Sequence, residues 1–257
     1  MRNYLAIVRK ELQSLFVSPI AYVVLAVFFG VSGYFFYIIL SFYVEQAAAR
    51  QFGPAPFPMD IPTVVMESFL GVLSTILLFL LPMVTMGVFA EERKRGTMEL
   101  LLTSPITHLQ LILGKFTGVF LFLVVMLVPA VMNILLLTVY SDPRPSASPY
   151  LVGLLGALLL GGSLLAVGVF ISSLTENQIV AAATTFGVFI ILWVLDAAAE
   201  ASTTLWNETL RYLSVLNHYE DFTKGILDTR HVVFYLSFVF LGLFLTSVSL
   251  DSEKWRK

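Results

Sequence analysis

Side chains capable of catalysis are few in this sequence, and none of them stands at a spacing that an active site requires. The three histidines, His108, His218 and His231, do not form the His-Glu-x-x-His pattern of a helical zinc site. No serine occupies the Gly-x-Ser-x-Gly turn of a hydrolase. The chain has no cysteine, so thiolate catalysis and thiol-bound metals are excluded. We therefore expect no catalytic residue, no metal site and no cofactor in this chain.

One pair of residues, Gly114-Lys115, resembles the end of a phosphate-binding loop. That loop reads Gly-x-x-x-x-Gly-Lys-Ser/Thr, and its backbone amides and lysine hold the phosphates. Leu109 stands where the first glycine is required, and Phe116 stands where serine or threonine is required. The sequence therefore predicts that the chain does not bind ATP by that route.

Polar residues inside the long apolar runs would mark an ion or proton path, and no acidic residue is clearly central in one. Glu67 and Asp196 lie at the ends of apolar runs. We interpret Lys115 as an anchor whose long side chain reaches back to the inner membrane surface. Asn133 lies deeper in the same run, and we expect it to join helices by hydrogen bonding.

The densest island of charge covers residues 91–105. Glu91 and Arg95 are four residues apart, so they can pair along a helical stem. Gly96-Thr97 then loosens the backbone and begins a new short helix, which Ser104-Pro105 ends. This order of elements predicts a charged stem followed by a short amphipathic helix.

Two interpretations of that short helix stay open from the residues alone. Met98, Leu101 and Leu102 fall on one side of it and Glu99 falls on the other. It is either an interfacial helix in a positively charged inner loop, or a coupling helix that inserts into a groove on a soluble partner.

The composition indicates that the bilayer is the solvent for most side chains. Hydrophobic residues make up 58% of the chain and charged residues 12%, whereas an average soluble domain is about 25% charged. The net charge of −2 gives no reason to expect nucleic-acid binding. Six uncharged segments approach or exceed the ~20 residues that a membrane-spanning helix needs. They are Ile20–Val44, Ser68–Ala90, Phe116–Tyr140, Tyr150–Ser173, Ile179–Leu195 and Val232–Leu250.

Lysine and arginine residues predict the orientation of these segments. With the N-terminus inside, ten of the fifteen fall on the cytoplasmic side and five on the outer side, which favours cytoplasmic termini. Residues 1–18 have apolar side chains near helical spacing, and Pro19 breaks the helix. We therefore expect an interfacial elbow helix there, rather than a simple extension of the first span.

The connections between spans are predicted to differ. Thr107–Gln110 and Thr175–Gln178 both fit a Thr-x-x-Gln capping box at a helix start. The proline-rich stretch 45–67 is expected to be ordered but non-helical, and Pro82 and Pro129 are expected to kink their helices.

The outer loop 197–231 should hold short helices at the outer interface. The predicted fold is thus a single all-α integral membrane domain, residues 1–257. It has six transmembrane helices, an N-terminal elbow helix, a cytoplasmic coupling helix, and outer interfacial helices before the last span.

Several residues occur in an order and spacing typical of one family. In chain order these are Arg9-Lys10-Glu11 with Leu12 and Phe16, Glu92, Gly96-Thr97-x-Glu99-x-Leu101-Leu102, Ser104-Pro105, Gly114-Lys115, His218, Phe222, Lys224-Gly225, Ile226, Asp228 and Val232-x-x-Tyr235. On these motifs nearly the whole chain resembles the permease subunits of type-2 ABC transporters, and its C-terminal part resembles the gliding-motility branch. Arg93-Lys94-Arg95 is more basic than the pattern needs.

The resemblance implies a permease half in the bacterial cytoplasmic membrane that pairs with an identical or different second half. Two separate cytoplasmic ATPase subunits would bind ATP and magnesium, and an extracytoplasmic auxiliary protein would sit on the long outer loop. Residues 91–106 would form the coupling loop, and the turn 175–178 a second contact. The residues expected to carry the coupling are Glu91, Glu92, Arg93, Gly96, Thr97, Glu99, Leu102 and Pro105, with Thr175, Glu176, Asn177 and Gln178 at the second contact.

Three classes of function remain open from the sequence. The first is a transporter subunit without catalytic residues, and the second is a membrane scaffold that recruits proteins on either side without moving anything. The third, an intramembrane enzyme, lacks a candidate nucleophile, metal set or acid pair. The small residues 181–185 are suited to close helix packing, either within this chain or against a second half. The substrate is not identified by any motif.

Overall fold

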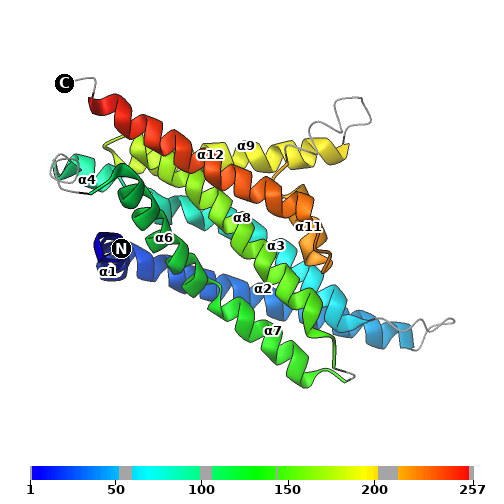
Figure 1. Ribbon diagram of the computed structural model, residues 1–257. Helices are drawn as coiled ribbons and strands as arrows, with labels where there is room; N and C mark the ends of the chain where they lie inside the picture. The colour runs from blue at the N-terminus through cyan, green and yellow to red at the C-terminus, as the bar shows by residue number, and fades with distance from the viewer. Residues whose placement is uncertain (1, 52–59, 99–105, 143, 202–213, 255–257) are drawn as a thin grey trace.

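The computed structural model describes residues 2–51, 60–98, 106–142, 144–201 and 214–254, and in these ranges the chain is helical with no strand. The helices are α1 Arg2–Val17, α2 Pro19–Gln51, α3 Ile61–Thr85, α4 Ala90–Lys94, α6 His108–Met126, α7 Val128–Tyr140, α8 Ala147–Ser173, α9 Gln178–Ala201, α11 Asn217–Thr223 and α12 Thr229–Lys254 (Figure 1). The all-α prediction is confirmed.

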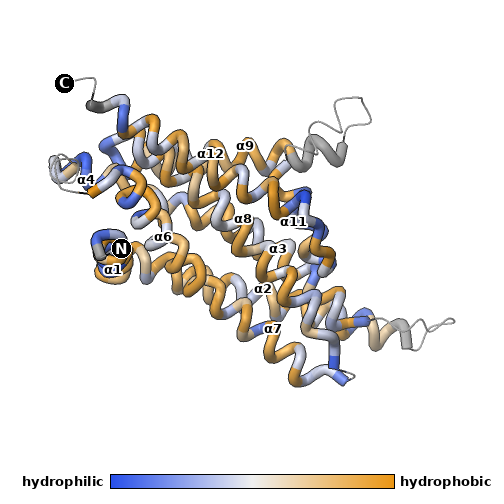
Figure 2. Tube along the Cα trace, viewed as in Figure 1, coloured by the Kyte–Doolittle hydropathy of each residue, from blue (hydrophilic) through white to orange (hydrophobic). Residues whose placement is uncertain are grey.

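Six helical stretches are long and apolar enough to cross a membrane, as predicted. Two of them are composite, because α3 continues into α4 and α6 continues into α7. Hydrophilic residues gather near α1, α4 and α11, while apolar residues dominate the lengths of the helices between them (Figure 2). Many large apolar side chains on α2 and α12 are exposed, which suits helices that face lipid.

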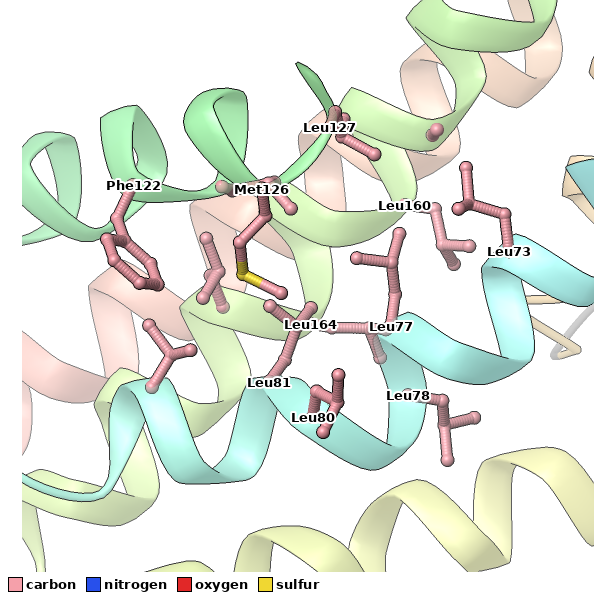
Figure 3. Packing of buried hydrophobic residues seen from close by; sticks show 14 of the residues in the cluster. Leu73, Leu77, Leu78, Leu80, Leu81, Phe122, Met126, Leu127, Leu160 and Leu164 are labelled. Carbon is pink, nitrogen blue, oxygen red and sulfur yellow. The ribbon is translucent and has the colours of Figure 1, made fainter. Parts of the chain in front are cut away.

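Helix α8 is the centre of the bundle, with α3, α6, α9, α11 and α12 packed around it. Small residues allow this close packing. A Cβ added at Gly242 of α12 would lie 2.8 Å from the backbone of Ala166 on α8, and one added at Gly168 would lie 2.3 Å from Thr85 on α3. Between these helices the core is filled by leucine, phenylalanine and methionine side chains, including Leu77, Phe122 and Leu164 (Figure 3).

The elbow is present, because α1 ends at Val17, Ser18 is a bend, and α2 begins at Pro19. Proline suits the first position of a helix, where its missing N–H would have no partner. The kink predicted at Pro129 is present, because α6 and α7 are separated at Leu127, two residues before that proline. Pro82 lies inside α3, which ends three residues later at Thr85.

The predicted bounds of two connections, 45–67 and 197–231, are wrong. Residues 45–51 continue α2 and residues 61–67 begin α3, so only the middle of the stretch 45–67 can be non-helical. Pro62 is compatible with helix because it occupies the first turn of α3. Helix α9 also continues past Asp196 to Ala201, and α12 begins at Thr229. Both ends of the loop predicted at 197–231 are therefore helical.

Candidate functional site

The predicted charged stem is a short helix, α4, that follows a turn at the end of α3. Glu91 Oε1 accepts a hydrogen bond from Arg95 Nη2 at 2.5 Å, as the spacing predicts. Gly96 then adopts a φ of +67°. The N–H of Gly96 donates to the carbonyl of Arg93 and the N–H of Thr97 donates to the carbonyl of Glu92, each at 3.0 Å. This pair of bonds is a Schellman motif, which requires a left-handed residue and so explains the glycine.

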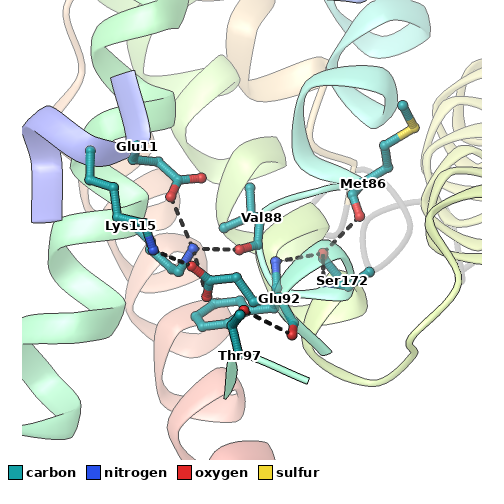
Figure 4. Close-up of polar contacts among 10 residues, drawn as sticks. Glu11, Met86, Val88, Glu92, Thr97, Lys115 and Ser172 are labelled. Carbon is teal, nitrogen blue, oxygen red and sulfur yellow. Dashed lines mark hydrogen bonds and ion pairs between the residues drawn. The ribbon is translucent and has the colours of Figure 1, made fainter. Parts of the chain in front are cut away.

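A serine from α8 holds the turn between α3 and α4. Ser172 Oγ accepts hydrogen bonds from the N–H groups of Phe89 and Ala90, at 3.1 and 3.2 Å, and donates to the carbonyl of Met86 at 3.0 Å (Figure 4). The amides at a helix start have no partner within the helix. Ser172 satisfies two of them at the start of α4, and it thereby fixes the stem to the central helix of the bundle.

Lys115, which lies on α6, also binds the turn between α3 and α4. Its ammonium lies 2.9 Å from Glu11 Oε2, 3.1 Å from Glu92 Oε2 and 2.6 Å from the carbonyl oxygen of Val88 (Figure 4). The Phe89 ring centroid lies 5.2 Å from the same nitrogen. Lys115 is only 2% exposed, so the interpretation as an anchor that reaches the membrane surface is wrong. The side chain binds three elements inside the protein.

Two glycines explain how α1 comes close enough to reach Lys115. A Cβ added at Gly114 would lie 2.7 Å from Ile7 Cγ2, and one added at Gly118 would lie 2.7 Å from Glu11 Cβ. The pattern Gly-x-x-x-Gly lets helix backbones approach closely. Here it brings Glu11 of α1 beside Lys115, which lies between the two glycines in the sequence.

The cluster formed by Lys10, Glu11, Glu92 and Lys115 is balanced in charge. Lys10 Nζ lies 3.0 Å from Glu92 Oε1, so two cations face two carboxylates. Burial raises the pKa of the Glu11 carboxyl above its ordinary value, and the neighbouring Lys115 ammonium opposes that shift. Removing one partner of a buried ion pair leaves an uncompensated charge, which costs about 3–5 kcal/mol. The cluster therefore holds α1, α4 and α6 in one relative arrangement.

The predicted second contact lies beside the stem, although its capping is not the one expected. Asn177 Oδ1 accepts a hydrogen bond from the N–H of Ile179 at 2.9 Å, and Thr175 Oγ1 accepts from the N–H of Asn177 at 3.1 Å. Asparagine is among the strongest N-cap residues, so α9 begins two residues later than a Thr175 cap would place it. The other predicted box, Thr107 with Gln110, is confirmed.

The two predicted contact segments meet at Gly87. A Cβ added there would lie 3.5 Å from Glu91 Oε2 and 3.6 Å from Gln178 Nε2. Arg93 lies on α4 and is partly buried, and Glu176 is exposed in the turn before α9. Glu99, Leu102 and Pro105 lie outside the described residues.

Sequence reasoning did not find the residues that bind this site together. Ser172 belongs to no motif, and Glu11 stands only in the Arg9-Lys10-Glu11 motif near the N-terminus. The one available signal was Lys115, a charge inside an apolar run between two glycines four residues apart. The expected helix-joining role of Asn133 is not supported, since its Nδ2 is buried without a hydrogen-bond partner among the described residues.

A second polar cluster lies at the far end of the bundle, between α11 and α12. His218 Nδ1 and His231 Nδ1 are 2.6 Å apart, and His231 Nε2 lies 2.7 Å from Asp221 Oδ2. In the neutral pair, one imidazole donates and the other accepts. Beneath this cluster Phe222 packs into a groove on α8, where a Cβ at Gly156 would lie 2.5 Å from Phe222 Cβ. A short helix is thus present at Asn217–Thr223, within the loop predicted to hold such helices, and it packs into the bundle.

Comparison with known proteins agrees with this architecture. Residues 5–249 match the model of a family described as ABC-2 family transporter protein. The chain is also 28% identical over 173 residues to a protein of Escherichia coli K12 named "Probable multidrug ABC transporter permease YbhR", and equally to its counterpart in Escherichia coli O157:H7. The match covers 65% of this chain and 44% of those relatives, so the chain spans less than half of their length.

The family match extends over the elbow helix, the stem and all six apolar stretches, so it includes every part of the site described above. The chain is an integral membrane protein of the permease type, and it belongs to the ABC-2 family of transporter proteins.

Proposed function

We propose that this permease transmits motion from a separate ABC ATPase to its membrane helices, and that the ion cluster around Lys115 is the joint that transmits it. The observation that carries the proposal is the position of Lys115, whose ammonium contacts the stem α4, the elbow helix α1 and the turn after α3. A push on α4 therefore reaches α1 and α6 directly, and it reaches α8 through Ser172.

The ATPase would bind the coupling loop after α4, which contains Glu99 and Leu102, and would touch the turn Thr175–Gln178 as a smaller contact. Closure of the ATPases around ATP and magnesium favours one of two arrangements of the joined helices. The transition is a rigid-body switch that is driven by the different contacts in the two states. This chain supplies no catalytic group to that cycle.

The proposal also includes the orientation of the chain in the membrane and its pairing with a second permease half. Both termini face the cytoplasm of a bacterium, because the inner connections carry most of the lysines and arginines. The ends of α1, α4 and α12 lie at one end of the bundle, as six spans require (Figure 1). A second permease half completes the path. On α9, Ala181 and Thr185 are buried within the chain while Ala183 and Thr184 are exposed, so the latter two are available to that second half.

The direction we propose is export, or work on an extracytoplasmic protein bound at the end that carries α11. The E. coli relatives are named probable multidrug ABC transporter permeases, which supports export of drugs as one candidate activity of this chain. Reconstitution with candidate compounds distinguishes the two, because exported substrates stimulate ATPase activity without any outer protein.

The test uses an ABC ATPase that co-purifies with this permease, and the two are reconstituted together in liposomes. Glu92→Gln and the pair Glu99→Ala with Leu102→Ala should leave membrane insertion intact and abolish the stimulation of ATPase activity. Glu220→Gln, a matched change on the short helix at the opposite end, should retain it. Co-purification without any stimulation in the unmodified protein would instead identify a membrane scaffold.

A further inference from the structure

The histidine pair at the far end of the bundle joins two helices through a contact that has room for one proton. His218 lies on α11 and His231 on α12, and their Nδ1 atoms are 2.6 Å apart. On the other side of its ring, His231 Nε2 lies 2.7 Å from Asp221 Oδ2. An ionised carboxylate only accepts hydrogen bonds, so His231 Nε2 carries a proton, and in the neutral ring Nδ1 accepts from the Nδ1–H of His218. The neutral pair therefore forms a continuous chain of donors and acceptors that ends on Asp221.

A first added proton leaves this contact intact. The two rings then hold one proton on each Nε2 and a third proton shared between the two Nδ1 atoms. His231 still donates to Asp221, and the carboxylate now faces a cation, which strengthens the hydrogen bond. The closed arrangement therefore accepts one proton without any change in its contacts.

A second added proton is incompatible with the same arrangement. Both Nδ1 atoms then carry a proton, so two N–H groups point at each other across 2.6 Å. Two positive rings also repel each other, and little water is present to screen them, because His218 is 6% exposed and the His231 side chain 14%. The Phe234 ring, whose centroid lies 3.9 Å from that of His218, covers the pair on one side. The two rings must separate before they can bind the second proton.

We infer that His218, His231 and Asp221 form a pH-sensitive latch between α11 and the start of α12, which is closed at neutral pH and opens in acid. The open form binds one proton more than the closed form, so a fall in pH favours the open form and a rise in pH restores the closed one. Histidine is the side chain whose ordinary pKa, about 6.5, lies in the physiological range. The latch therefore opens progressively below about pH 6.5.

The other ionisable groups that surround the latch among the described residues are of types that titrate outside that range. Carboxyl groups ordinarily have a pKa near 4, and tyrosine, lysine and arginine keep their protons below about pH 9. These groups are Tyr219, Glu220 and Lys224 on α11, Asp228, Arg230 and Tyr235 on or just before α12, Asp60 and Glu67 at the start of α3, and Tyr150 on α8. A structural response between about pH 5 and pH 7 is thus specific to histidine.

Packing elsewhere confines the movement to the start of α12. Phe222 keeps α11 in its groove on α8. One turn after His231, the Tyr235 hydroxyl donates a hydrogen bond to the carbonyl of Val215 at 2.7 Å, and this bond holds the rest of α12. Opening therefore releases the first turn of α12, around Thr229, from α11.

The latch and the ion cluster around Lys115 lie at opposite ends of the bundle, near α11 and α4 (Figure 1). In the orientation proposed above, the latch is on the outer side of the membrane and responds to external pH. Its opening is a property of the permease alone. An absent latch and an absent ATPase coupling are therefore distinguishable by experiment.

The experiment is double electron–electron resonance spectroscopy of the full chain in nanodiscs, from about pH 8 to about pH 4. The sequence has no cysteine, so two introduced cysteines carry the only spin labels. Thr229→Cys and Leu174→Cys, at exposed positions, report the distance from the start of α12 to the far end of α8. We expect a second distance below about pH 6.5, and an open-to-closed ratio that rises up to about tenfold per pH unit, the limit for one proton. Labels at the two ends of α8, from Leu151→Cys and Leu174→Cys, should keep one distance.

Four variants identify the groups that titrate. His218→Gln and, independently, His231→Gln leave one histidine at the contact, so the second distance should no longer rise in acid. Asp221→Asn removes the carboxylate that holds the first proton, so opening should begin at a higher pH. His108→Gln, at the opposite end of the bundle, should leave the response unchanged.

The outcomes that overturn the latch are separate from these. A single distance at every pH in the unmodified chain would show that the contact does not open. An undiminished response in folded His218→Gln and His231→Gln, or a response that begins only near pH 4, would assign the movement to carboxyl groups instead. An unchanged onset in Asp221→Asn would exclude Asp221 from the latch.

Discussion

The two short helices α4 and α11, at opposite ends of the bundle, are built from the same local elements. Each carries a glutamate that pairs with a cation four residues later, Glu91 with Arg95 and Glu220 with Lys224. Each is followed by a glycine at positive φ, +67° at residue 96 and +76° at residue 225. Each ends with the same pair of backbone hydrogen bonds around that glycine.

The helices differ in how they are docked. The turn before α4 is held by polar side chains from other elements, namely Ser172 of α8 and Lys115 of α6, the latter bonded also to Glu11 of α1. Helix α11 instead inserts Phe222 into a glycine groove on α8. Its polar contacts are short-range in sequence, such as His218 with His231.

The same local design therefore suits two different mechanical roles. Ion pairs and hydrogen bonds between separate helices can be exchanged for others when the helices move, so α4 is suited to a joint. Close packing of an aromatic ring against glycine has one geometry, because interiors are densely packed, so α11 is suited to a fixed plug.

Lys115→Met should produce the largest loss, about 3–5 kcal/mol in the free energy of unfolding, because it leaves buried carboxylates without a counter-charge. Thermal unfolding in detergent measures the loss. Adding Glu11→Gln in the same chain should restore part of it, and the exposed Lys94→Met should cost little. A loss no larger than that of Lys94→Met would mean that the cluster does not hold the joint.

Gly225→Ala should cost about 3 kcal/mol, and Gly96→Ala about 1 kcal/mol, although both place a side chain at positive φ. The difference arises because a Cβ at residue 225 would lie 2.5 Å from Pro149 Cβ, while nothing lies within 4 Å of one at residue 96. Chemical or thermal denaturation of both variants measures this difference in the free energy of unfolding. Equal losses would contradict the view that α11 is the more tightly packed helix.

Ser172→Ala should cost about 2 kcal/mol, because it leaves two buried amides of the stem without an acceptor. Ser163→Ala is the matched control, since Ser163 is buried on the same helix and donates only to the carbonyl of Leu160 in its own helix. Comparison of the two melting temperatures gives the result. If the control loses as much, Ser172 has no special role at the turn.

The smallest expected effect is a difference in pH dependence between the ion pairs Glu91–Arg95 and Glu220–Lys224. The hydrogen bond to Glu220 raises the pKa of Lys224, so that pair stabilises the fold below the unfolded-state pKa and loses its contribution as pH rises through the raised value. Both side chains are substantially exposed, so solvent screening keeps the contribution near 0.3 kcal/mol.

An arginine guanidinium is not deprotonated in proteins, unlike a lysine ammonium. Between about pH 9 and pH 11.5, the stability difference between the unmodified chain and Lys224→Met should therefore disappear, while the difference for Arg95→Met should persist. Loss of both differences together would indicate general alkaline unfolding instead of titration of one pair.

Much of the fold was predictable because its signals are local. The six apolar stretches, the break at Pro19, the cap at Thr107 and the pairing of Glu91 with Arg95 each depend on a property of the residues themselves or on contacts within four residues. The same local reasoning failed at Thr175, because Thr175 and Asn177, two positions apart, can each cap a helix, and Asn177 does so here.

The sequence by itself determined which segments are helices, how α4 ends at Gly96, and that Lys115 stands inside an apolar run. Only the tertiary structure decided that its side chain binds Glu11, 104 residues away, and that Ser172 completes a turn 82 and 83 residues before it. The physical reason is that such contacts depend on the packing of α1, α6 and α8 against one another. That packing is the sum of many weak contacts and small-residue approaches, and no single stretch of the chain specifies it.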